Sequence, residues 1–426
     1  MNILIKNINA ICNNDIQIVN IITKDDLIYD ILPIDQLPSN FKIDKTIDGS
    51  NKLAVPGFIN THTHAAMTLL RGYADDMLLM DWLQNKVWPA EAKLIREDVY
   101  WGSKLAIAEM IQSGTTCFAD MYFFMDETAK AVEETGIRAD LSRGITGFGP
   151  DSDDKLAEAV KFATQWQGKA QGRITTRLGP HAPYTCPPAF IKKVVEVAKI
   201  GGHKIHIHLS ETKEEVDTCI QKFGMTPIEH MNNLGLFDLP TLAAHCVHIN
   251  DNDLSIIKSK NVTIAHNPQS NLKLASGIAP LKNIIKYNIP VGLGTDSATS
   301  NNNLDMLEEI RLAALLHKNN EFDPLFLPAP QALSLACQGG AQALNLPQLG
   351  VLQKGYKADI VLFDTTAPVW HPQHNIISTL VYSAPSSSVH TVIVNGQILL
   401  ENKEFKTIDI EKTIFEANKA AKQLVK

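Results

Sequence analysis

Residues 55–64, Val-Pro-Gly-Phe-Ile-Asn-Thr-His-Thr-His, join an apolar segment with strand character directly to two histidines, His62 and His64. In a doubly wound α/β sheet, the first strand is normally followed by a glycine-rich loop that cradles phosphate. Here the two histidines stand in that place. Because residues i and i+2 of a strand share a face, both imidazoles can converge on one metal ion.

Downstream of this segment, short apolar runs alternate with longer segments whose apolar residues recur at helical spacing. With the opening segment at 55–60, the predicted strands are 115–120, 137–143, 174–179, 204–209, 241–245, 262–266 and 291–294. Eight strand–helix units over about 300 residues are typical of a (β/α)8 barrel. We therefore predict an α/β fold with a TIM-barrel catalytic domain over residues 55–350.

The two ends of the chain have a different texture. Short β-branched runs separated by Asn and Asp occupy residues 1–54, and two further strands are predicted at 358–363 and 389–394, the second followed by the hairpin signal Asn395-Gly396. We expect residues 1–54 and 351–405 to pair into one small β-sandwich domain. Residues 406–426 are predicted to form a C-terminal helix.

Composition excludes several classes of protein. Of 426 residues, 45% are hydrophobic, and 39 basic against 46 acidic residues give a net charge of −7, which argues against nucleic acid as a partner. No run of about 18 apolar residues predicts a membrane span, and no signal peptide is apparent. The six scattered cysteines form no C-x-x-C pair, so we expect reduced, buried thiols in a cytoplasmic protein.

Further polar residues follow the later predicted strands, at the catalytic face of such a barrel. His206 and His208 share a face of the strand at 204–209; the second lies nearer the strand end, so we interpret His208 as a ligand and His206 as an interior residue. Glu211 is close enough to act as an acid or base. His245 and Asp296 end two more strands.

Three histidines, or two with a carboxylate, describe a catalytic zinc site with an open position, and zinc lowers the pKa of bound water to about 7. The H-x-E and P-C-x-x-C signature of cytidine-type zinc deaminases is absent. Each of these side chains taken alone also fits a structural role. We interpret His266 as a neighbour of the site, Asn267, Ser270 and Asn271 as turn residues, and His317 as a surface or capping residue.

Seven segments in this order resemble the amidohydrolase superfamily, and more closely its 5′-methylthioadenosine/S-adenosylhomocysteine deaminase branch. They are PGFINTHTHAAMTLLRG (56–72), HLSETKEE (208–215), LAAHCVH (242–248), AHNPQSNLKLASG (265–277), VGLGTDS (291–297), GVLQKGYKADIVLFD (350–364) and VIVNGQILL (392–400). The stretch at 61–91 is the most specific. The resemblance implies a metal-bearing barrel with a β-sandwich built from both chain ends.

The resemblance also implies roles for individual residues. His62, His64, His208 and Asp296 would hold one metal, usually zinc. Glu211 would protonate the purine nitrogen N1, and His245 and Asp296 would manage the proton of the water. The implied substrate contacts, in addition to Glu211 and Asp296, are Glu91 at the ribose hydroxyls, His181, and Arg143 at the distal part of the substrate. Some members carry a second arginine a dozen residues later, where this chain has GPDSDDKLA (149–157).

We therefore expect a zinc-dependent aminohydrolase that converts 5′-methylthioadenosine and S-adenosylhomocysteine to inosine-type products and ammonia. The alternatives are deamination of adenosine, 5′-deoxyadenosine or guanine, triazine dechlorination, and a non-catalytic barrel scaffold. Fe²⁺ or Mn²⁺ also suits such ligands. The expected partners are a small nucleoside and water, with no nucleic acid and no membrane, in a homodimer or homotetramer in the cytoplasm.

Overall fold

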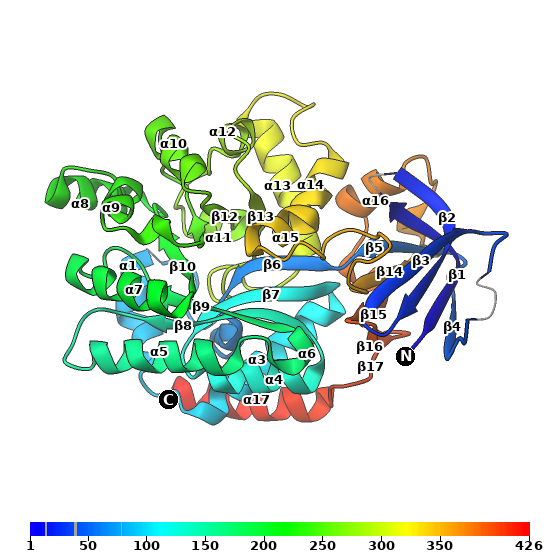
Figure 1. Cartoon of the computed structure of the whole chain (residues 1–426), viewed down its shortest axis with the longest axis horizontal. Helices are drawn as coiled ribbons and strands as arrows, with labels where there is room; N and C mark the ends of the chain where they lie inside the picture. The colour runs from blue at the N-terminus through cyan, green and yellow to red at the C-terminus, as the bar shows by residue number, and fades with distance from the viewer. Residues whose placement is uncertain (13–14, 38–40, 78) are drawn as a thin grey trace.

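The computed structural model describes residues 1–12, 15–37, 41–77 and 79–426, and its centre is an eight-stranded parallel barrel (Figure 1). The barrel strands follow one another in chain order around the sheet. They are β6 (Phe58–Thr63), β7 (Thr115–Tyr122), β8 (Arg138–Ile145), β9 (Ile174–Pro180), β10 (Lys204–Leu209), β11 (Thr241–His245), β12 (Thr263–His266) and β13 (Val291–Leu293). The predicted α/β barrel is confirmed.

The first barrel strand differs from its predicted extent. It begins at Phe58 and includes His62, whereas Val55 and Pro56 belong to β5 (Lys52–Pro56) of a second sheet. One continuous apolar run therefore supplies two strands. Periodicity could not separate them, because both strands are almost wholly buried.

The barrel closes where β6 meets β13. The amide of Asp296 donates to the carbonyl of His62 at 2.9 Å, and the hydroxyl of Thr61 donates to the carbonyl of Leu293 at 2.9 Å. Gly294 is needed at this seam, since a Cβ there would lie 2.8 Å from the amide nitrogen of His62. The closure thus brings the two ends of the barrel sequence, and the polar residues they carry, into contact.

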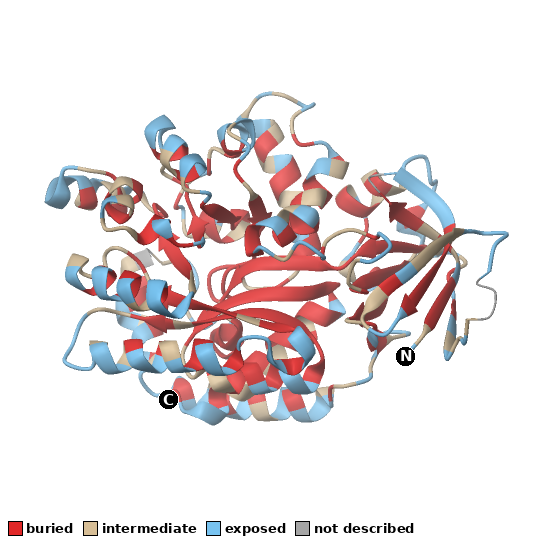
Figure 2. Cartoon of the chain, in the orientation of Figure 1, coloured by how far each residue is buried: buried red, intermediate tan, exposed pale blue. Residues whose placement is uncertain are grey.

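Helices surround the barrel and turn their polar faces to solvent, while the strands between them are buried (Figure 2). The longer helices are α3 (Arg96–Gln112), α4 (Met125–Thr135), α5 (Ser152–Trp166), α7 (Pro188–Gly201), α8 (Lys213–Phe223), α10 (Asp251–Ser259), α13 (Met306–Asn320) and α14 (Ala329–Ala336). Shorter helices are α1 (Leu79–Trp82), α2 (Trp88–Glu91), α6 (Lys169–Gly172), α9 (Pro227–Asn233), α11 (Pro268–Lys273), α12 (Leu281–Lys286), α15 (Gln338–Leu344) and α16 (Ile376–Tyr382). The predicted C-terminal helix is α17 (Ile410–Leu424), which runs beside α3.

Both ends of the chain build the second sheet, which is mixed and has nine strands in the order β17-β16-β15-β14-β5-β1-β2-β3, with β4 beside β1. Its remaining strands are β1 (Ile3–Cys12), β2 (Asp15–Lys24), β3 (Leu27–Pro33), β4 (Lys45–Asp48), β14 (Ile360–Asp364), β15 (Val389–Val394), β16 (Gln397–Glu401) and β17 (Glu404–Phe405). The antiparallel pairing of β5 with β14 joins the early and late strands. The domain limits at residues 54 and 350 remain predictions.

Two buried ion pairs occupy the N-terminal end of the barrel. The Arg138 guanidinium donates to both carboxylate oxygens of Asp359, at 2.9 and 3.1 Å, which ties β8 to the mixed sheet. Inside the barrel, Arg177 donates to Asp140 at 2.8 Å and to the carbonyl of Leu344 at 2.9 Å. Both arginines are bonded at several nitrogens, as burial of a charge requires.

All six cysteines are buried with free thiols, as the sequence predicts. Within the described ranges, no helix is both long and apolar enough to cross a membrane.

Candidate active site

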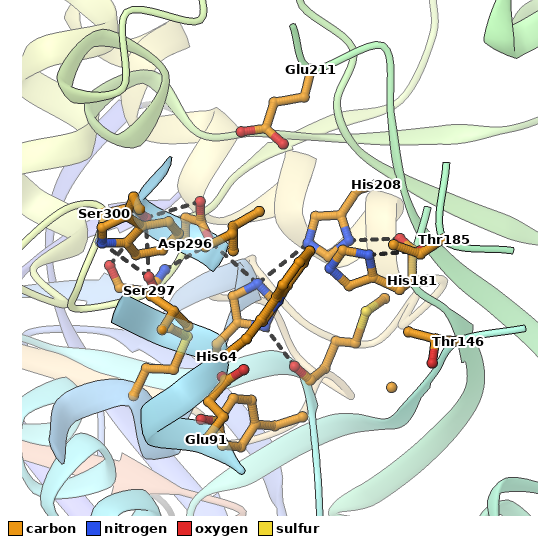
Figure 3. Close-up of a pocket in the computed structure, with 18 of the residues that line it drawn as sticks. His64, Glu91, Thr146, His181, Thr185, His208, Glu211, Asp296, Ser297 and Ser300 are labelled. Carbon is orange, nitrogen blue, oxygen red and sulfur yellow. Dashed lines mark hydrogen bonds and ion pairs between the residues drawn. The ribbon is translucent and has the colours of Figure 1, made fainter. Parts of the chain in front are cut away.

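A cluster of histidine nitrogens and one carboxylate lies at the C-terminal mouth of the barrel (Figure 3). His64 Nε2 is 3.3 Å from His208 Nε2 and 3.4 Å from Asp296 Oδ1, and His62 Nε2 is 3.5 Å from the same carboxylate oxygen. Four ligands about 2.0–2.1 Å from a tetrahedral zinc ion lie about 3.3–3.4 Å apart. The spacing of these atoms is therefore that of ligands around one divalent metal ion.

The tautomers of His64 and His208 support this interpretation. Nδ1 of His64 lies 2.5 Å from the carbonyl of Met121, and Nδ1 of His208 lies 2.7 Å from the carbonyl of His181. A carbonyl can only accept, so both Nδ1 atoms carry the proton and both Nε2 atoms carry a lone pair. Two lone pairs that face each other at 3.3 Å repel unless a cation lies between them.

The tautomer of His62 follows from a longer chain of hydrogen bonds. The hydroxyl of Ser142 donates to the carbonyl of Asp120 at 2.8 Å, so it must accept from His206 Nδ1 at 3.2 Å. Nε2 of His206 then accepts from His62 Nδ1 at 2.9 Å. His62 Nε2 is left with a free lone pair, and it is buried without a hydrogen-bond partner among the described residues.

Burial keeps His62, His206 and His208 neutral, because water no longer stabilises the charged form. It lowers the pKa of His62 to about 4 and holds the pKa values of His206 and His208 well below their ordinary value. Neutral imidazole is the form that binds a metal.

Asp296 and His245 are held in place by residues after β12. The Asp296 carboxylate accepts from Ser270 at 2.6 Å, and His245 Nδ1 lies 2.9 Å from Asn271 Oδ1. Asp296 and His245 both have positive φ, at 58° and 73°, a conformation that non-glycine residues rarely adopt. Such strain occurs mainly at functional sites. Ser270 and Asn271 are thus more than the turn residues that the sequence predicts, because they orient two site residues.

Glu211 lies above the cluster in Figure 3, with Oε2 3.8 Å from His245 Nε2. Burial raises the pKa of Glu211, although the neighbouring His245 opposes the rise. Burial lowers the pKa of His245, but the carboxylates of Glu211 and Asp296 outweigh it, so the net shift is upward. Each of these two groups therefore binds a proton more tightly than it would in water.

Glu91, His181, Glu211, His245 and Asp296 line the same cavity. Glu91 lies across the cluster from Glu211 (Figure 3). Burial raises the pKa of Glu91 to about 7, although a hydrogen bond from Tyr122 opposes the rise. His181 lies at the cavity wall with Nδ1 3.0 Å from the hydroxyl of Thr185.

Arg143 is placed differently. Among the residues that the structure describes, it is not part of the cavity lining, although its neighbours Phe123 and Gly144 are. Its guanidinium bonds to the carbonyl of Gly144, lies 3.4 Å from a carboxylate oxygen of Glu158, and stacks over the ring of Phe123. In this arrangement the guanidinium of Arg143 contacts protein groups and does not face the cavity.

Some residues of the site carried no distinctive sequence signal. Ser142, Ser300, Tyr122 and Tyr184 lie in or beside the cavity at positions that strand and helix patterns do not distinguish. His317 is fully buried with Nε2 2.9 Å from Nε2 of His266, so its interpretation as a surface or capping residue is wrong. His317 lies on the inner face of α13, and the helical spacing of the apolar residues in this segment could have predicted its burial.

Comparison with known proteins agrees with this site. Residues 53–399 match the model of the amidohydrolase family. The chain is 54% identical over 385 residues to a 5-methylthioadenosine/S-adenosylhomocysteine deaminase of Dictyoglomus thermophilum, covering 90% of each chain. It is 51% identical over the full length of both chains to the enzyme of the same name from Dictyoglomus turgidum.

Solved structures agree as well. An adenosine deaminase of Xanthomonas campestris with bound zinc is 33% identical and superimposes with a TM-score of 0.95 over 99% of this chain and 98% of that one. An atrazine chlorohydrolase of Arthrobacter aurescens complexed with zinc has a TM-score of 0.91 at 24% identity, covering 98% and 100%, and shares the fold.

Proposed function

The chain belongs to the amidohydrolase family, and we propose that it hydrolyses 5′-methylthioadenosine and S-adenosylhomocysteine to the corresponding inosine-type product and ammonia. It is a hydrolase of C–N bonds, a deaminase like its relatives at about 50% identity. One observation carries the choice of an adenine nucleoside: two carboxyl groups, those of Glu91 and Glu211, line one cavity on either side of the His/Asp cluster.

His62, His64, His208 and Asp296 would hold one Zn²⁺. The fit rests on the unpartnered His62 Nε2 and on the opposed lone pairs of His64 and His208. When bound, zinc supplies a water acidic enough to react at neutral pH.

The protein's own groups account for the movement of protons. Glu211, whose pKa is raised by burial, holds a proton that it can give to N1 of the adenine, so the ring does not accumulate negative charge when water adds at C6. His245 and Asp296 accept the proton of the attacking water and return it to the amino group. The C6–N bond then breaks and ammonia leaves, while the C6 hydroxyl gives its proton back to Glu211 and becomes the C6 carbonyl of the product.

Glu91 supports recognition of a nucleoside. Its carboxylate can accept hydrogen bonds from both ribose hydroxyls, which a free base or a triazine lacks. His181 would contact the substrate at the cavity wall. To contact the charged 5′ substituent of S-adenosylhomocysteine, Arg143 would have to leave Glu158. The neutral methylthio group of 5′-methylthioadenosine would not need this contact.

The decisive assay compares kcat/KM for 5′-methylthioadenosine, S-adenosylhomocysteine, adenosine and 5′-deoxyadenosine with zinc-loaded enzyme, following ammonia and the fall in adenine absorbance. We expect the two thio-substituted nucleosides to be the best substrates. If none of the four changes the spectrum, the proposal is wrong; a preference for guanine would favour the free-base alternative. Metal analysis tests for one zinc per subunit. Sedimentation tests for a homodimer or homotetramer, and cell fractionation for a cytoplasmic location.

A further inference from the structure

Glu215 makes an unusual pair of contacts behind the proton donor Glu211. Its carboxylate accepts from the backbone amide of Ser210 at 3.0 Å and from that of Glu211 itself at 2.8 Å. Both glutamates are buried: Glu211 lines the cavity, and the carboxylate of Glu215 binds the backbone. One carboxylate therefore holds two consecutive peptide groups.

These contacts go beyond the capping of helix α8. In a capping box, the glutamate at the third helical position accepts from the amide of the N-cap residue. Here the N-cap is Thr212, whose hydroxyl accepts from the amide of Glu215 at 3.2 Å. The Glu215 side chain instead reaches the two residues before the cap, so the cap does not depend on it.

The turn that Glu215 holds is strained. Ser210 has a φ of 51°, in the left-handed region that disfavours a residue with a Cβ. The carbonyl of Ser210 is held from the other side by the amide of His248 at 2.9 Å. If the carboxylate released the two amides, Ser210 could relax to negative φ, and this rotation would swing the Glu211 side chain away from the cavity.

We propose that Glu215 is a positioning residue for the reaction: it locks the strained turn at Ser210 and so aims the carboxyl group of Glu211 at the substrate ring. The proposal rests on the proposed function only for the identity of the group that Glu211 protonates. Glu215 touches no substrate atom in this scheme, and it acts through Glu211 alone.

A double-mutant cycle tests this dependence. In Glu215→Gln, an amide nitrogen replaces one acceptor oxygen, and we expect kcat for 5′-methylthioadenosine to fall about 10- to 100-fold, within the usual range for loss of an aligned proton donor. KM and bound metal should stay near their wild-type values. In a Glu211→Gln background, the same substitution should cost less than about threefold. Equal losses in both backgrounds would overturn the proposal, because Glu215 would then act independently of Glu211.

Glu214→Gln is the matched control, since Glu214 is exposed on the same first turn of α8. It should keep wild-type kcat, and a loss equal to that of Glu215→Gln would contradict the proposal. A readout without turnover comes from crystal structures of the wild type and Glu215→Gln. We expect the positive φ of Ser210 to be lost and Glu211 displaced in the variant; an unchanged turn would overturn the proposal. The structural comparison tests the role of Glu215 even if no adenosine derivative proves to be a substrate.

Discussion

At its N-terminal end the barrel buries the charged side chains of Arg138 and Arg177, whose guanidinium groups bond to carboxylates and carbonyls, whereas at its mouth ionisable side chains are buried with atoms that lack partners. Among the described residues, His62 Nε2 and Asp120 Oδ2 are such atoms. His245 and Asp296, which both have positive φ, also lie at the mouth. A buried polar group without a partner costs free energy, so the mouth retains an arrangement that stability alone would not select. The buried arginine pairs at the N-terminal end therefore stabilise the fold, and the residues at the mouth serve the chemistry.

We expect the largest effect from the loss of a proposed metal ligand. His208→Ala should abolish deamination and reduce bound metal, because one of the four converging atoms is lost. Metal content by mass spectrometry and ammonia release measure both effects. His374→Ala, at an exposed position, should change neither. Retention of metal and activity in His208→Ala would exclude it from the ligand set.

The Glu211→Gln variant distinguishes proton delivery from metal binding at the mouth of the barrel. We expect the variant to retain its metal and to lose about two to four orders of magnitude in kcat, since the amide cannot supply the proton. Steady-state kinetics and metal analysis decide this. Near-wild-type turnover would remove Glu211 from the mechanism.

The opposite end is tested by Arg138→Met, which leaves the Asp359 carboxylate buried without its cation. We expect a loss of about 3–5 kcal/mol in the free energy of unfolding, seen as a lower denaturation midpoint. The folded enzyme should keep its kcat. Adding Asp359→Leu should recover much of the loss, since a buried ion pair can be replaced by apolar residues. A large fall in kcat without loss of stability would contradict the division between the two ends.

Ser142→Ala probes the chain of hydrogen bonds that sets the tautomer of His62. Loss of the serine hydroxyl frees the ring of His206 and removes the constraint on His62 Nδ1. We expect metal affinity to fall about 10- to 100-fold, as for other groups that orient a ligand. Competition with a chelator measures it. Unchanged affinity would show that the tautomer is set by burial alone.

The smallest effect concerns pH. Glu91 has a pKa raised to about 7 by burial, so its carboxylate form increases as pH rises through that value. In the proposed ribose contact, the ionised form would accept hydrogen bonds from the hydroxyls best. The ratio of wild-type to Glu91→Gln kcat/KM should therefore rise about tenfold from about pH 6 to about pH 8. A ratio that stays flat over this range would contradict the ribose contact.

The barrel was predictable because each strand is a compact apolar run and each helix carries its own period, as in β10 followed by α8. The roles that the resemblance implies stay predictions, but the convergence of His62, His208 and Asp296 at the mouth could be expected, since they stand at or near strand ends. The relation of Ser142 to His206 and His62 could not, because it joins three strands through side chains that no local pattern distinguishes. The role of Glu215 was hidden for a similar reason: its spacing predicts an ordinary helix cap.

The pairing of β5 with β14 has a consequence for the newly made chain. Roughly 300 residues separate the two strands, which at about 5–20 residues per second is on the order of 15–60 seconds of synthesis. Throughout that interval the apolar edge of β5 has no β14 to cover it. Exposed strand edges invite pairing with other chains, so we expect the nascent protein to be most prone to aggregation before its last strands emerge.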